Sequence, residues 1–153
     1  MPSASLSVPH YRQELPYSCV AACVRMVLAF HGQPHPEADL RQLLNTRPSG
    51  TRARGVLAVT SLGFDAQFLT SNLAQLRDAL VAGTPPIVFV DTGPLDYWQT
   101  DCAHVLVVVG LDDLTASFND PFFDAAPQRS SLDSFLQAWA LNGHLAVFLR
   151  PRP

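Results

Sequence analysis

Lysine is missing from the 153-residue sequence, and all ten basic residues are arginines. Without a lysine amine, the protein cannot form a Schiff base, hold pyridoxal phosphate through lysine, or use a serine–lysine dyad. The net charge of -3 gives no electrostatic reason to expect binding to nucleic acid or to a membrane surface. Covalent chemistry, if the protein performs any, must therefore use a different nucleophile.

Long hydrophobic runs are also missing. The apolar stretches, such as residues 87–90 and 105–109, are far shorter than the roughly 20 residues that a membrane-spanning helix needs. Residues 1–9 have neither the basic region nor the apolar region of a signal peptide, so we expect a cytoplasmic protein without membrane insertion. The three cysteines are an odd number, which favours free thiols over a disulfide framework.

The apolar pattern changes along the chain from helical to strand-like. Nearly every residue from 20 to 30 is apolar or small, which predicts a buried helix within residues 17–31 that ends at Gly32. Further helices are predicted over residues 36–44, 53–62, 71–83 and 132–140, the last capped by Ser131. Runs rich in Val and Phe predict strands over residues 66–69, 87–91, 104–111, 116–119 and 145–149. This order predicts one α+β domain, residues 1–153, with an N-terminal helical half packed against a mostly antiparallel sheet.

Cys19 lies at the start of the predicted buried helix. The unpaired N–H groups and the positive dipole end of a helix N-terminus stabilise a thiolate, which is the nucleophilic form of cysteine. His104 opens an apolar strand and can take a proton from a thiol across a cleft at the end of that strand. The alternative is that Cys19 is a small core residue and His104 a core-edge histidine bonded to a carbonyl.

Three further polar residues are candidates for supporting roles. Asp120 would accept the Nδ1–H of His104 and fix its tautomer, although the amide of Asn119 is a rival for this role. Adjacent residues of a strand face opposite sides, so only one of the two can orient His104. Gln13, upstream of Cys19, would donate its side-chain amide to a developing oxyanion beside the backbone N–H of Cys19. The alternatives are a turn at Asp120 and a surface position for Gln13.

The order and spacing of these residues resemble those of a known family. Residues 13–32, QELPYSCVAACVRMVLAFHG, are similar to the N-terminal signature of the bacteriocin-processing, double-glycine leader peptidase family. Residues 104–112, HVLVVVGLD, with the following Asn119-Asp120-Pro121, are similar to its His and Asp motifs, and residues 55–63 to its middle helix. The resemblance covers roughly residues 8–149 and departs from the family pattern at Val20, where glycine is usual.

This resemblance implies a papain-like fold and hydrolysis of a peptide bond through a thioester, in the family's case after a Gly-Gly leader. By position it makes Cys19 the nucleophile, His104 the base, Asp120 the orienting residue and Gln13 the oxyanion donor. It implies no cofactor. It also implies a peptide or protein substrate, with a transporter or secretion system as the candidate partner.

Other functions remain open. The same fold could hold peptides without cutting them, or the thioester could pass to an amine in an amidase or acyl transferase. A zinc site of Cys19, Cys23, Cys102 and His104 fits poorly, because C-x3-C within one helix is not the usual zinc spacing.

Two more features have open roles. Cys23 falls on the core stripe of its helix, whereas Cys102 either lies near the active site or in an exposed loop. The loop at residues 95–98 either lines a substrate groove or packs on its own side chains.

Overall fold

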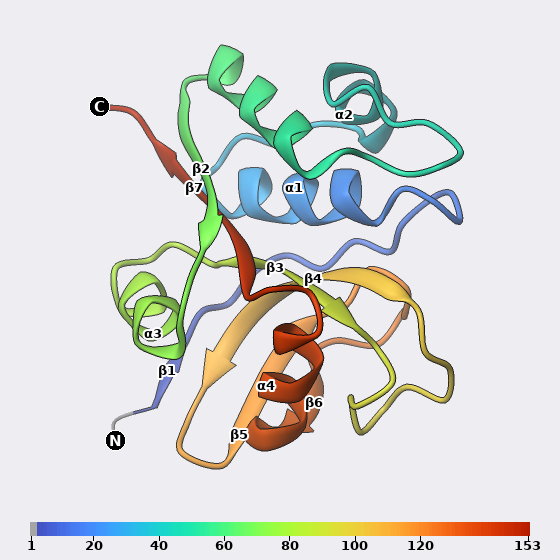
Figure 1. Ribbon diagram of the computed structural model, residues 1–153. Coiled ribbons are helices and arrows are strands. Elements are labelled where there is room, and N and C mark those ends of the chain that lie inside the picture. Colours follow the sequence, from blue (N-terminus) through green and yellow to red (C-terminus); the bar gives the residue numbers. More distant parts are fainter. Residues whose placement is uncertain (1–2) are drawn as a thin grey trace.

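The computed structural model describes residues 3–153, and a seven-stranded antiparallel sheet forms its centre (Figure 1). The strands follow the order β2-β7-β3-β4-β5-β6, and β1 pairs with β4. Their bounds are β1 Ala4–Ser5, β2 Phe64–Thr70, β3 Ile87–Asp91, β4 Ala103–Leu111, β5 Thr115–Asn119, β6 Gln128–Ser131 and β7 Leu145–Pro151. Met1 and Pro2 lie outside the described residues, and the assignment of one domain over residues 1–153 stays a prediction.

Helices cover both faces of the sheet (Figure 1). Their bounds are α1 Cys19–Phe30, α2 Glu37–Leu43, the 3-10 helix η1 Ala53–Leu62, α3 Leu73–Val81 and α4 Leu132–Ala140. The first three pack against one face and the last two against the other. This confirms the predicted α+β architecture, with the N-terminal helical half against an antiparallel sheet.

The apolar side chains of strand β4 pack alternately against the helices on the two faces of the sheet. Val105 and Val107 pack with α1, while Leu106 and Val108 pack with α3 and α4. Because successive side chains of a strand point to opposite faces, a strand covered on both sides must be apolar at every position. The continuous apolar run that begins after His104 is therefore the signature of a central strand.

The predicted elements agree with the structure except in two respects. Residues 53–62 form a 3-10 helix, which is tighter than an α-helix, and it ends at Gly63 with a φ of 89°. The strands β1 and β6, which have two and four residues, were not predicted from the sequence. Both are too short and too polar to carry a strand pattern of their own, and they form by pairing with β4 and β5.

Candidate active site

The candidate active site is a cleft of about 420 Å³ at one end of the sheet, beside the N-terminus of α1. Gln13, Cys19 and His104 all line it, so the fold brings together residues from the N-terminal segment, from α1 and from β4. The remaining lining residues are Pro16, Tyr17, Pro48, Ser49, Gly50, Trp98, Thr100, Cys102, Ala103 and Phe122. Asp120 lies behind His104 and is fully buried.

Cys19, His104 and Asp120 come together at the wall of the cleft. The half-buried Cys19 begins α1 and lines the cleft together with His104, whose pKa its side chain helps to raise. On the other side of the ring, His104 Nε2 lies 2.7 Å from Asp120 Oδ1. The imidazole therefore stands between a thiol and a carboxylate, which is the arrangement that activates a cysteine nucleophile.

The ring nitrogen that meets Asp120 is Nε2, not the Nδ1 expected from the sequence. In the register of β4 and β5, Val107 is opposite Asn119, and continuing this register places Asp120 opposite Leu106. Asp120 is thus displaced along the strand from His104, and the ring reaches it with its distal nitrogen. Because Nε2 is occupied, Nδ1 is the nitrogen left for the thiol of Cys19.

Asp120 accepts hydrogen bonds from four donors. Besides the His104 ring, the backbone N–H of Phe122 donates to Oδ1 at 3.0 Å. The hydroxyl of Tyr97 and the indole Nε1 of Trp98 donate to Oδ2 at 2.8 and 2.9 Å. Burial alone raises the pKa of this carboxyl, but the hydrogen bond and charge of His104, helped by Phe122 and Trp98, hold its pKa below the usual value. Asp120 is therefore an ionised carboxylate with a fixed orientation.

The neighbouring Asn119 points elsewhere. Its side-chain amide donates to the carbonyl of Val8 at 2.9 Å, so it ties the N-terminal segment to the sheet. Because successive side chains at the end of β5 point to opposite sides, Asp120 faces His104 and Asn119 faces the N-terminal segment at Val8.

The environment of His104 favours its charged form. Burial opposes the charge, but the hydrogen bonds and charges of Asp120 and Cys19 outweigh this effect and raise the pKa of His104 to about 9. The edge of its ring packs against Trp98, with centroids 5.1 Å apart. Trp98 thus contacts both His104 and Asp120. The sequence did not predict this contact for the loop at residues 95–98.

Gln13 lines the same cleft as Cys19 and is held there by two hydrogen bonds. Its backbone N–H donates to Pro121 O at 2.7 Å, and its side-chain Nε2 donates to Leu15 O at 2.8 Å. The side-chain Oε1 is buried and has no hydrogen-bond partner among the described residues. Since an amide nitrogen carries two protons, one N–H of Gln13 is left over at the wall of the cleft.

The other two cysteines differ from Cys19. Cys23 is fully buried, donates to Val105 O at 3.5 Å, and has a pKa raised by burial, with a smaller contribution from the charge of Cys19. It is a core residue, as its position on the helix predicted. Cys102 is exposed and lines the cleft, with its Sγ 3.6 Å from Thr92 Oγ1.

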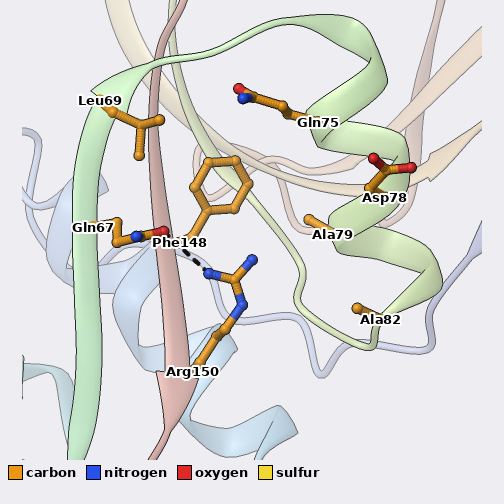
Figure 2. A pocket seen from close by; sticks show the side chains of 8 residues that line it. All are labelled: Gln67, Leu69, Gln75, Asp78, Ala79, Ala82, Phe148 and Arg150. Carbon is orange, nitrogen blue, oxygen red and sulfur yellow. Dashed lines mark hydrogen bonds between the residues drawn. The ribbon is translucent and has the colours of Figure 1, made fainter.

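A second hollow, of about 300 Å³, lies between α3 and strands β2 and β7 (Figure 2). Its side chains include Phe148, Asp78 and Arg150, and the last donates to Gln67 Oε1 at 3.2 Å. It contains no cysteine or histidine and opens on the α3 side of the sheet, so it lacks the thiol and the imidazole of the cleft.

Within residues 3–153, no group of three or more His, Cys, Asp or Glu side chains is placed to hold a metal ion. None of the helices in the same range has the length and apolar character needed to span a bilayer.

A cysteine at the start of the helix on one face of an antiparallel sheet, beside a histidine on the central strand, defines a papain-like cysteine peptidase fold. Residues 7–152 match the Peptidase C39 family, and the chain belongs to it. This confirms the resemblance to double-glycine leader peptidases. An uncharacterized protein of Methanothermobacter thermautotrophicus is 33% identical over 140 residues, covering 91% of this chain and 87% of the relative.

Three solved structures are similar over nearly the whole chain. A C39-like peptidase from Bacillus anthracis has a TM-score of 0.82 at 19% identity, covering 99% of both chains. The peptidase domain of Streptococcus ComA, a bifunctional ABC transporter involved in quorum sensing, has a TM-score of 0.76 at 27% identity, covering 94% of this chain and 98% of that domain. A double glycine motif protease from an AMS/PCAT transporter, in complex with the leader peptide, has a TM-score of 0.77 at 21% identity, covering 97% and 94%.

Proposed function

We propose that this chain is a cytoplasmic cysteine peptidase in which Cys19 attacks a peptide bond and His104 and Asp120 activate it. The observation that carries the proposal is the position of His104, which lines the cleft together with Cys19 and has its Nε2 2.7 Å from the buried carboxylate of Asp120. A structural histidine in the core has no need of both a thiol beside it in a cleft and a fully buried carboxylate behind it.

The reaction follows from the geometry of these residues. His104 takes the thiol proton, and the Cys19 thiolate attacks the peptide carbonyl carbon to form a tetrahedral oxyanion. The backbone N–H of Cys19 and the spare N–H of Gln13 donate to this oxyanion. His104 then gives its proton to the leaving amine, and a thioester forms. Water attacks the thioester with His104 as the base, which releases the acid and restores the thiol.

Asp120 acts through His104. Its carboxylate accepts the Nε2–H, so the ring presents Nδ1 to the thiol in the required tautomer and is stabilised when it becomes an imidazolium. The donors Tyr97 and Trp98 keep the carboxylate in place during the cycle.

We further propose that the substrate is a peptide or protein cut after a Gly-Gly leader, delivered by a transporter or secretion partner. The family supports this, as do the similar peptidase domains of transporters, one of which was solved with a leader peptide. No step of this chemistry requires a metal or an organic cofactor.

The test uses a synthetic leader peptide that contains Gly-Gly, a matched peptide in which both glycines are alanine, and mass spectrometry of the products. We expect cleavage after Gly-Gly by the wild type and none by Cys19→Ala. Cleavage that survives Cys19→Ala would contradict the proposed nucleophile. Binding without cleavage would favour a peptide-binding module, and an amide product formed with an added amine would favour acyl transfer.

A further inference from the structure

We propose that Glu37 is a positioning residue whose buried carboxylate fixes the segment between Gln13 and Cys19. The inference rests on the proposed function, because these two residues are the proposed oxyanion donor and nucleophile. Glu37 itself lies outside the cleft, on helix α2, and nothing in the sequence pattern connects it with the reaction.

One oxygen of Glu37 holds both ends of the segment. The carboxylate is fully buried, and its Oε1 accepts the backbone N–H of Glu14 at 3.0 Å. The same oxygen lies 3.1 Å from the hydroxyl of Ser18, which donates to it. Glu14 directly follows Gln13 and Ser18 directly precedes Cys19, so the carboxylate fixes the chain next to each of them.

A second set of contacts carries this constraint to the amide of Gln13. The hydroxyl of Ser18 accepts the backbone N–H of Leu15 at 3.0 Å, and the carbonyl of Leu15 accepts Nε2 of Gln13 at 2.8 Å. Ser18 precedes α1 but makes no capping bond to it, although serine is a favoured N-cap residue. Its hydroxyl is used to shape the segment instead. Glu37, Ser18 and Leu15 thus form a continuous path to the proposed oxyanion donor.

Arg41 pairs with the carboxylate of Glu37 and also contacts Glu14. Arg41, one turn further along α2, has Nη1 3.4 Å from Oε2 of Glu37 and Nη2 3.6 Å from Oε1 of Glu14. Burial, together with the charge of Glu14, raises the pKa of Glu37 above its usual value, and the hydrogen bonds from Glu14 and Ser18 and the charge of Arg41 offset only part of this rise. A buried carboxylate is costly unless it is paired and hydrogen-bonded. Here Oε1 is hydrogen-bonded to the active-site segment, while Oε2 has the ion pair with Arg41 but no hydrogen bond.

Loss of this acceptor leaves the N–H of Glu14 without a partner and leaves the hydroxyl of Ser18 to donate only to Leu15 O, 3.0 Å away, so the segment loses its tie to α2 and shifts. A misplacement of about 1 Å can lower a catalytic rate about 100-fold. The oxyanion exists only in the transition state, so the loss falls on kcat and not on KM. We expect Glu37→Ala to lower kcat about tenfold or more with KM within about twofold. Glu37→Gln keeps an oxygen acceptor and should recover most of kcat.

The matched control is Asp39→Ala. Asp39 is the other acidic residue in the first turn of α2, is exposed, and should leave kcat unchanged. Circular dichroism and thermal melting establish that each variant is folded. If Glu37→Ala does not fold, Ser18→Ala decides, because it removes only the Ser18 part of the path. A folded variant that loses kcat at constant KM supports the inference, and wild-type kcat in both variants overturns it.

Failure of the proposed function would look different. If Cys19→Ala retains turnover, the nucleophile is wrong, whatever Glu37 does. If Cys19→Ala is inactive while folded Glu37→Ala has wild-type kcat, only the positioning role is wrong.

Discussion

His104 meets Asp120 through Nε2 at 2.7 Å, so that Nδ1 remains for Cys19. The carboxylate stabilises the imidazolium from the side opposite to the thiol. A substitution at Asp120 can therefore change the pKa of His104 without altering Cys19, the proposed nucleophile.

Asp120→Asn should move the basic limb of the pH–activity profile to lower pH. The pKa of His104 is raised to about 9, so its proton is available to the leaving amine below that pH and is lost above it. A neutral amide stabilises the imidazolium less, so the pKa falls towards the ordinary value of about 6.5. The measurement is kcat/KM between pH 5 and 10 for both proteins. A basic limb at the same pH in the variant would mean that Asp120 does not act on His104.

The same shift affects stability. The pKa of His104 is higher in the folded than in the unfolded protein, so its contribution is fully present below about pH 6.5 and is lost as the pH rises through about 9. Wild-type unfolding by urea at pH 6 and pH 10, compared with Asp120→Asn, measures this. The variant should lose less stability between the two pH values than the wild type does.

Tyr97→Phe should destabilise the fold. The hydroxyl of Tyr97 donates to Asp120 at 2.8 Å, and hydrogen bonds to charged groups contribute about 1.5–3 kcal/mol. Urea unfolding at pH 7 gives the change in free energy. Tyr17→Phe is the control, because no hydrogen bond of the Tyr17 hydroxyl is found among the described residues. Equal stabilities of the two variants would contradict the role of Tyr97.

Gln13→Ala should lower kcat with little change in KM. The spare N–H of Gln13 meets negative charge only in the transition state, and removal of one oxyanion donor typically lowers kcat by about 10²–10³. Steady-state kinetics on the Gly-Gly peptide give both constants. A change confined to KM would point to a simple substrate contact instead.

The purified protein should contain no stoichiometric metal. Cys19 and Cys23 lie in one helix, the latter is buried in the core, and Cys102 is exposed, so the spacing suits zinc poorly. Elemental analysis after purification without chelator measures the content. About one zinc per chain would overturn this prediction.

Much of the fold could be predicted because its signals are local. The Ser131 cap marks the start of α4, and the apolar run marks β4. The strands β1 and β6 could not be predicted, because pairing and not their own residues makes them strands. The four proposed catalytic positions followed from motif spacing, but the choice of Asp120 over Asn119 needed the register of β5.

The contacts that hold the site residues in place could not be predicted from the sequence. Tyr97 and Trp98 reach Asp120 from a loop more than twenty residues away in the sequence, and residues 48–50 reach the cleft from another loop. Glu37, on α2, contacts Ser18, which directly precedes α1. Such contacts depend on how the layers pack, and no local pattern encodes them.

The most direct test of the central claim, that Cys19 and His104 work as a pair, needs no substrate. It follows alkylation of Cys19 by iodoacetamide at pH 6, in a Cys23→Ser, Cys102→Ser background so that a single thiol reacts. An ordinary thiol is almost wholly protonated and unreactive at this pH, whereas a thiol paired with the His104 imidazolium reacts as the thiolate. We predict rapid labelling that falls about tenfold or more in His104→Ala and less in Asp120→Asn. Slow labelling at pH 6 that does not change in His104→Ala would contradict the account.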